Sequence, residues 1–315
     1  MIRTVLLGLS ATILLTSSVF ARTFSIGTNP QGSLAYSTGA GIAKVANEVA
    51  GIKARVVPQG GGPVVTLPLV NKGELDFSIS ISMLAVLANK GVAMFKKSGK
   101  QPNAQVVAAV IPLELGWFVR KDSNIKSMKD LKGKRVSSKL SKQKAILVTG
   151  RAKLATVGLT YKDMVGVPAP NGVRQVQDFM AGKIDAVTFS LSSGMTAQAN
   201  AKVGIRVLSL PKSPEAEKAM QKLAPGSRIE TRHPGSKYPG ILGPTNIFVA
   251  PFLLMASSKT PNDIVYKVTK AIYENKKKLV ASHKAFGGMD PKKMHAKIGV
   301  PYHAGALKFY KEKGM

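Results

Sequence analysis

The sequence predicts an α/β fold built from two lobes, and three observations support this prediction. Short β-prone runs alternate with stretches of helical periodicity from residue 23 onward, a pattern typical of a mostly parallel sheet flanked by helices. A second series of the same kind begins after residue 120. The chain has 315 residues, and a single hydrophobic core usually stops growing at about 250–300 residues.

The first series alternates strand, loop and helix. Ile42, Val45 and Val49 recur at helical spacing. The apolar stretch that follows Pro63 contains Pro68, which would kink a helix there. The strands of this series are expected at 23–28, 53–57 and 76–81.

The second series continues toward the end of the chain. Helices are expected at 145–154 and 215–223, and the rest of 211–245 is expected to form loops because it is rich in Pro, Gly and charge. A late helix is predicted after Thr260, a suitable N-cap residue, with Pro261 at its first position. The strands are expected at 115–120, 134–138, 185–190, 204–210 and 246–255.

The late strand and helix are expected to rejoin the first series, which makes one lobe discontinuous. Lobe 1 then contains residues 22–116 and 246–315, and lobe 2 contains residues 117–245. The chain would cross between the lobes near 115–120 and 246–250. Because ligands of open α/β sheets lie outside the carboxyl ends of the strands, a ligand site is expected between the lobes.

Residues 1–21 have the pattern of a secretory signal peptide that is cleaved after Ala21. Arg3 is followed by an apolar run from Val5 to Leu15, and small residues precede the expected cut. The alternative is an uncleaved membrane anchor, but the run is shorter than the ~20 residues that span a bilayer. The sequence therefore predicts an exported, periplasmic protein without stable membrane insertion.

Charge and cysteine content exclude several classes of function. The net charge of +30 suggests nucleic acid as a partner, but the lysine runs at 276–278 and 292–293 lack the interleaved aromatic residues that stack on bases. We therefore expect no nucleic-acid partner. The absence of cysteine excludes disulfides and thiol catalysis.

Catalytic and metal-binding motifs are also missing from the sequence. There is no Gly-x-Ser-x-Gly elbow, and the four histidines lack the His-Glu-x-x-His spacing of zinc sites. We predict no catalytic residues, no metal and no cofactor. A periplasmic enzyme stays open as an alternative.

Two glycine-rich loops follow the first two expected strands. Residues 27–33 have nearly the glycine spacing of a phosphate-binding loop, but the lysine that should follow Gly32 is missing, which disfavours nucleotide chemistry. Residues 59–63 repeat the arrangement with three consecutive glycines. Small side chains at the start of a helix leave backbone N–H groups free, so these loops are candidate seats for an anion.

An ordered set of motifs resembles the TAXI family of TRAP-transporter solute receptors. The resemblance covers nearly all of the chain after residue 22. The first loop with Tyr36 is similar to the family's Gly-Thr-rich opening, and Tyr238-Pro239-Gly240 resembles its Tyr-Pro-Gly. Further matches are Gly60 to Gly62, Lys72 to Asp76, Asp130 to Ser137, Gly182 to Ala186, Val265 to Asn275 and Pro301 to Glu312.

The resemblance implies a periplasmic-binding-protein-like clamp of type II. Such a clamp would close on a small anionic or zwitterionic solute, such as glutamate, glutamine or a related organic acid, and would pass it to a TRAP permease driven by an ion gradient. Carried over by position, the ligand-binding residues would be Asn29, Gln31, Gly32, Ser33, Tyr36, Gly61, Gly62, Ser80, Ser82, Ser141, Ser192, Ser193, Gly194 and Tyr238.

The loop after the strand at 134–138 departs from the family pattern. A small Gly-Ser-Gly-Thr-like loop is usual there, whereas this chain has lysines at 139, 142 and 144. Lys139 or Lys142 would pair with an acidic solute through a charge-assisted hydrogen bond; alternatively, both face solvent. Two further alternatives for function are the binding protein of an ATP-driven importer and a sensory ligand-binding protein.

Overall fold

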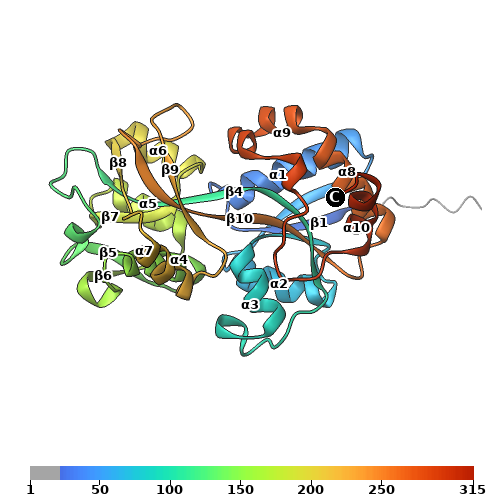
Figure 1. Cartoon of the computed structure of the whole chain (residues 1–315), viewed down its shortest axis with the longest axis horizontal. Coiled ribbons are helices and arrows are strands. Elements are labelled where there is room, and N and C mark those ends of the chain that lie inside the picture. The colour runs from blue at the N-terminus through green and yellow to red at the C-terminus, as the bar shows by residue number, and fades with distance from the viewer. Residues whose placement is uncertain (1–21) are drawn as a thin grey trace, which may run out of the picture.

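The computed structural model describes residues 22–315, so the expected cleavage site at Ala21 lies outside the described residues. Ten strands form one mixed sheet with helices packed around it. Two groups of elements are joined by two long strands, β4 (Ala104–Arg120) and β10 (Thr245–Ser257), which run between them (Figure 1). The α/β fold predicted from the sequence is confirmed.

The first group contains both the N-terminal and the C-terminal elements. Its three short strands are parallel in the order β2-β1-β3, and β10 closes this part of the sheet antiparallel to β3. The strands are β1 (Phe24–Thr28), β2 (Ala54–Pro58) and β3 (Phe77–Ile81). The helices are α1 (Leu34–Val49), α2 (Pro63–Lys72), α3 (Ser82–Lys90), α8 (Asn262–Glu274), α9 (Lys276–Ser282) and α10 (Ala304–Glu312).

The second group is built from the middle of the chain. Strands β6, β5 and β7 are parallel, and β7 and β8 pair antiparallel with the end of β4. The strands are β5 (Arg135–Leu140), β6 (Val165–Ala169), β7 (Ala186–Ser190), β8 (Ile205–Leu208) and β9 (Arg228–Arg232). The helices are α4 (Ala145–Ala155), α5 (Gly172–Met180), α6 (Gly194–Val203) and α7 (Pro214–Leu223).

Strand pairing supports the predicted division into lobes, which we keep as a proposal. Strand β4 pairs with β10 from Ala104 to Leu115 and then with β7 and β8 from Leu115 to Arg120. The change of partner lies at the proposed boundary near residue 116. Below, the first group is called lobe 1 and the second group lobe 2.

The connecting strands carry two prolines that face each other. Pro112 of β4 and Pro251 of β10 are register partners, and the register shifts between Phe252 and Leu253. Proline cannot donate a backbone hydrogen bond, so two donors are missing where the strands leave lobe 1. The ladder of β4 and β10 is therefore interrupted at this point.

Three local expectations differ from the structure. Thr260 does not cap α8; its hydroxyl donates to the Asp76 carbonyl, and Pro261 holds the N-cap position. Strand β4 begins at Ala104 rather than at residue 115, because its first half is a mostly buried apolar run that continues directly into the second half. Strand β9 lies in a stretch that the sequence predicted as loops.

Two glycines with positive φ flank helix α2. Gly73 ends α2 in the left-handed conformation with φ of 81°, and Gly62 starts the same helix with φ of 58°. Helix α1 begins at Ser33, whose Oγ accepts from the Tyr36 amide at 3.2 Å. Within residues 22–315, no helix combines the length and the apolar character that crossing a membrane requires.

Candidate functional site

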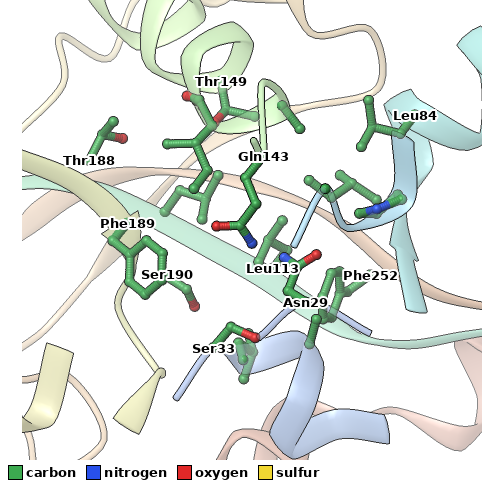
Figure 2. Close-up of a pocket in the computed structure, with 18 residues that line it drawn as sticks. Asn29, Ser33, Leu84, Leu113, Gln143, Thr149, Thr188, Phe189, Ser190 and Phe252 are labelled. Atoms are coloured by element: carbon green, nitrogen blue, oxygen red, sulfur yellow. Dashed lines mark hydrogen bonds between the residues drawn. The ribbon is translucent and has the colours of Figure 1, made fainter. Parts of the chain in front are cut away.

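A cavity of about 70 Å³ lies between the lobes and is called the inner cavity here. Figure 2 shows its residues, with the Gln143 and Asn29 amides pointing toward each other. Its lining comes from both lobes and from the two connecting strands. The lining residues are Asn29, Ser33, Leu34, Ala35, Gly61, Pro63, Ile81, Leu84, Leu113, Leu115, Gln143, Ala145, Ile146, Thr149, Thr188, Phe189, Ser190 and Phe252.

The two glycine-rich loops form the lobe 1 side of the inner cavity. They follow β1 and β2, which are parallel neighbours, so both loops leave the same edge of the sheet. A Cβ on Gly62 would collide with Asn29 Oδ1, so the glycine lets the second loop approach the first. Ser33 and Gly61 complete this wall.

Gln143 is the central residue of the lobe 2 side. Its backbone has φ of 51°, which is unusual for a residue with a side chain. Its Oε1 accepts from the Gly172 amide at 2.7 Å, so the orientation of the amide is determined. The Nε2 group is buried and has no hydrogen-bond partner within the described chain.

Three buried polar atoms of the lining residues lack partners in the part of the chain that the structure describes. They are Asn29 Oδ1, Gln143 Nε2 and Ser190 Oγ. Buried polar groups are normally hydrogen-bonded, so each such atom needs an explanation. All three belong to residues that line the inner cavity, and Asn29 Oδ1 lies against Gly62.

The electrostatics of the inner cavity come from helix ends rather than from charged side chains. No lysine, arginine, aspartate or glutamate is among the residues that line it. The first residues of α1, α2 and α4 do line it, namely Leu34, Pro63 and Ala145. Helix N-termini carry partial positive charge, so three of them favour a negative group inside.

The lobes touch each other around the inner cavity. The Met195 amide of lobe 2 donates to the Gly32 carbonyl of lobe 1 at 3.4 Å. The Lys142 side chain lies against Gly60, where an added Cβ would come within 2.8 Å of the lysine Cδ. The two lobes therefore contact each other beside the inner cavity.

A second, larger cavity of about 670 Å³ lies beside the first and is called the outer cavity. Gly61 and Gln143 line both cavities. The outer cavity contains four lysines, two from each lobe, and no carboxylate among its lining residues. It is lined by Gln59, Gly60, Gly61, Val64, Val65, Ala93, Met94, Lys96, Lys97, Ser141, Lys142, Gln143 and Lys144.

Five of the residues predicted from the sequence line these two cavities. Asn29, Ser33 and Gly61 line the inner cavity, and Gly61, Ser141 and Lys142 line the outer one. Two more predicted residues, Gly32 and Gly62, belong to the glycine-rich loops, and Gly62 contacts Asn29. Ser193 and Gly194 follow β7, and a Cβ on Gly194 would lie 4.0 Å from the Gly32 carbonyl. Ser193 caps α6 through a 3.1 Å bond from the Thr196 amide.

Ser192 and Tyr238 bind a buried carboxylate instead of lining a cavity. Glu114 of β4 is 1% exposed; it accepts from Tyr238 Oη at 2.9 Å and from Ser192 Oγ at 3.4 Å. Arg232 Nε donates to the same carboxylate at 2.8 Å. Burial lowers the pKa of Arg232, but hydrogen bonds to Glu114 and Glu230 outweigh this and raise it above its ordinary value. The arginine therefore stays charged in this network.

The remaining predicted residues lie outside both cavity linings. Gln31 and Lys139 are exposed, and Tyr36 is half-buried on α1. Ser80 is fully buried and donates to the Ile81 carbonyl at 3.3 Å. Ser82 starts α3 with a buried hydroxyl that has no partner among the described residues. A ligand role for these residues remains a prediction.

Sequence reasoning missed Gln143, Thr149, Thr188 and Ser190, which line the inner cavity. Thr188 and Ser190 belong to β7, which the sequence did predict as a strand, so its carboxyl end was a usable signal. Gln143 lies in the loop that departs from the family pattern. In the described residues, no three His, Asp or Glu side chains gather to hold a metal ion.

Comparisons with known proteins show what this fold is similar to. Solved structures of similar fold include one described as a periplasmic transporter (17% identity, covering 94% of this chain and 93% of that chain, TM-score 0.60). Another is MatC from Rhodopseudomonas palustris with bound malate (12% identity, covering 93% of this chain and 96% of that chain, TM-score 0.59). A third is the alkanesulfonate-binding protein SsuA from Xanthomonas axonopodis pv. citri bound to MOPS (16% identity, covering 92% of this chain and 90% of that chain, TM-score 0.52).

These likenesses concern the fold, and they confirm the periplasmic-binding-protein-like architecture predicted from the sequence. The description of the matching family model is NMT1-like family, and the match extends over residues 26–314. That range includes both glycine-rich loops, both connecting strands and every residue of the two cavities. The chain belongs to the NMT1-like family.

Proposed function

We propose that this protein is a periplasmic solute-binding receptor that captures a small carboxylate-bearing solute between its lobes. The observation that carries the proposal is the inner cavity, which loops from both lobes enclose and in which Asn29, Gln143 and Ser190 have buried atoms without partners among the described residues. A solute that supplies these partners stabilises the closed arrangement. The fold relatives include a protein described as a periplasmic transporter and two proteins with a bound acid or buffer, which supports the same class of function.

A carboxylate suits the inner cavity for two reasons. Gln143 Nε2 is a donor that a carboxylate oxygen can accept from, and the N-terminal ends of α1, α2 and α4 favour negative charge. Asn29 Oδ1 is an acceptor that the ammonium group of a zwitterion can satisfy. Glutamate, glutamine and related organic acids carry these groups.

The proposed ligand contacts combine the sequence prediction with the cavity lining. Asn29, Ser33 and Gly61 belong to both sets, and Gln143, Thr149, Thr188 and Ser190 join them. Of the two lysines predicted to pair with an acidic solute, Lys142 lines the outer cavity and Lys139 lines neither cavity. The proposed ion pair with the solute is therefore assigned to Lys142.

Capture proceeds by hinge closure about β4 and β10. The solute contacts both lobes only in the closed arrangement, so it shifts the equilibrium between open and closed forms toward closure. The Met195–Gly32 hydrogen bond and the Lys142–Gly60 contact form at the same step. A closed receptor then presents a surface that the open receptor does not have.

The partner that we propose is a TRAP-type permease driven by an ion gradient, and residues 1–21 would direct export to the periplasm. This proposal depends on the motif resemblance to the TAXI family. A binding protein of an ATP-driven importer is the main alternative. The neighbouring genes separate the two, because a large fused permease gene supports the proposal and an ATPase gene contradicts it.

The direct test is native mass spectrometry of the protein isolated from the periplasm, followed by calorimetry with the solute it carries. We expect a small organic acid to co-purify and Asn29→Ala to weaken its binding about tenfold. Asn124→Ala, which changes an exposed asparagine of lobe 2, is the matched control. The proposal fails when nothing co-purifies and neither amino acids nor organic acids raise the temperature of thermal unfolding.

A further inference from the structure

The inner cavity is too small to hold a whole organic acid of the proposed class. Its volume is about 70 Å³, whereas an apolar cavity that binds benzene measures about 150 Å³. Only a few heavy atoms of a solute therefore fit inside. The rest of the solute has to continue into neighbouring space.

The outer cavity is that neighbouring space. Gly61 of lobe 1 and Gln143 of lobe 2 line both cavities, so the two cavities are adjacent at these residues. Gly61 places no side chain between the two cavities. The buried amide of Gln143 stands beside it and has a free donor within the described chain.

The charge of the outer cavity selects what it can hold. Lys96 and Lys97 come from lobe 1, and Lys142 and Lys144 come from lobe 2. None of these four lysines forms an ion pair with any residue that the structure describes, and no carboxylate lines the cavity. Closure brings like charges of both lobes together, which is unfavourable unless an anion lies between them.

Backbone strain marks the same place. Ala93 and Gln143 are the two non-glycine residues of the described chain with positive φ, at 55° and 51°. Both line the outer cavity. Strained residues persist where the surrounding structure imposes them and gather at ligand-binding sites. Their position is a second observation, independent of charge, that supports a ligand-binding role for the outer cavity.

We propose that the solute is an organic dianion whose two acidic groups occupy different cavities. One group accepts from Gln143 Nε2 in the inner cavity, and the second lies among Lys96, Lys97, Lys142 and Lys144 in the outer cavity. The inference rests on the proposed function and names its substrate class. The lysines thereby turn a general carboxylate site into one that prefers two charges.

The test compares straight-chain α,ω-dicarboxylates of four to nine carbons with monocarboxylates of the same length, by calorimetry. The variant is Lys142→Gln/Lys144→Gln. The control is Lys129→Gln/Lys132→Gln, which removes the same charge from exposed positions of the same lobe outside both cavities. Thermal unfolding of each variant checks that the fold is retained.

We expect at least one dicarboxylate to bind about tenfold or more tightly than its monocarboxylate counterpart. The cavity variant should remove this advantage by accelerating release of the dicarboxylate, while monocarboxylate affinity stays within about twofold. The control variant should leave the affinities for dicarboxylates and monocarboxylates unchanged.

Two outcomes overturn the inference. In one, the cavity variant affects mono- and dicarboxylates equally or affects neither; the proposed function survives this result if Asn29→Ala still weakens binding. In the other, no dicarboxylate binds at all. The co-purified solute then decides separately whether the protein is a receptor for another class of molecule.

Discussion

Gln143 combines a backbone conformation and a hydrogen bond that only its surroundings can impose. Its φ of 51° directs the side chain toward the inner cavity, and the Gly172 amide holds Oε1 at 2.7 Å. The Nε2 group is then left as a donor with no partner in the described chain. This residue therefore carries the proposed contact to the solute carboxylate.

Replacing Gln143 with glutamate separates the two functions of the amide. The introduced carboxylate still accepts from Gly172, but when ionised it has no donor and repels a carboxylate. We expect calorimetry at pH 8 to give more than tenfold weaker binding of the co-purified acid. Binding should recover at acidic pH, where the introduced carboxyl group is protonated and regains an O–H donor.

The control for this experiment is Gln177→Glu, an exposed position on α5 with the same change of charge. It should leave affinity unchanged at every pH. Equal affinity of Gln143→Glu and the natural protein at pH 8 would exclude a carboxylate contact at this amide.

Lys153 is a buried lysine whose ammonium group has no hydrogen-bond partner in the described chain. Its side chain is 0% exposed, its Nζ lies 5.1 Å above the Phe248 ring, and no described residue accepts a hydrogen bond from it. Burial lowers the pKa of Lys153 from 10.5 to about 7. The folded state therefore binds this proton less readily than the unfolded chain.

Lys153→Met should stabilise the protein, and the gain should depend on pH. Between about pH 7 and pH 10.5 the unfolded chain holds a proton that the folded protein has released, so the stability of the natural protein rises with pH across this window. The variant lacks this contribution, so its advantage is largest near pH 6, on the order of a few kcal/mol. Denaturant unfolding at pH 6 and pH 10 measures the difference. An advantage that is equal at both pH values contradicts the assignment.

Among the elements, the connecting strands are where we place the proposed hinge. Pro112 and Pro251 face each other, and the register shift between Phe252 and Leu253 follows directly. The ladder of β4 and β10 therefore has fewer donors there than elsewhere along these strands. Bending at this point breaks few interactions, which suits a hinge.

Pro112→Ala/Pro251→Ala should stiffen this hinge. The alanines supply two backbone donors, so amides at 111–115 and 248–252 are expected to exchange hydrogen more slowly with solvent. Hydrogen-exchange mass spectrometry measures this. Pro102→Ala, at an exposed position before β4, is the control. Unchanged protection in the double variant would place the hinge elsewhere.

At the scale of the whole molecule, the charge of +30 gives a role to long-range electrostatics. A strongly positive protein attracts anionic solutes before contact, and salt screens this attraction over about 10 Å at 0.1 M ionic strength. Four of the lysines line the outer cavity, which has no carboxylate among its lining residues. In the proposed receptor, this charge would act on the capture of the solute rather than on the fold.

The association rate of an anionic solute should therefore fall several-fold when salt is raised from about 10 mM to about 300 mM. The release rate, measured in the same stopped-flow experiment, serves as the internal reference and should change less. Small-angle scattering on the same samples should report a more compact protein with solute bound. An association rate that does not depend on salt contradicts steering by the lysines.

Much of the fold was predictable because it depends on local pattern. The helical spacing around Ile42 and the β-prone runs at 23–28 and 53–57 correspond to α1, β1 and β2. The site was less predictable. Ser192 and Tyr238 have the polar groups of ligand-binding residues, but both bind Glu114, which lies 78 and 124 positions away. No local pattern reveals such a partner.

Local sequence patterns were enough to predict an α/β fold and the glycine-rich loops that follow two of its strands. Periodicity and turn chemistry act over a few residues, so they can be recognised without coordinates. Local patterns do not reveal which polar groups of the described chain remain without partners, or which lysines line a common cavity. Those properties depend on contacts between residues such as Gly61 and Gln143, which folding brings together from distant parts of the chain.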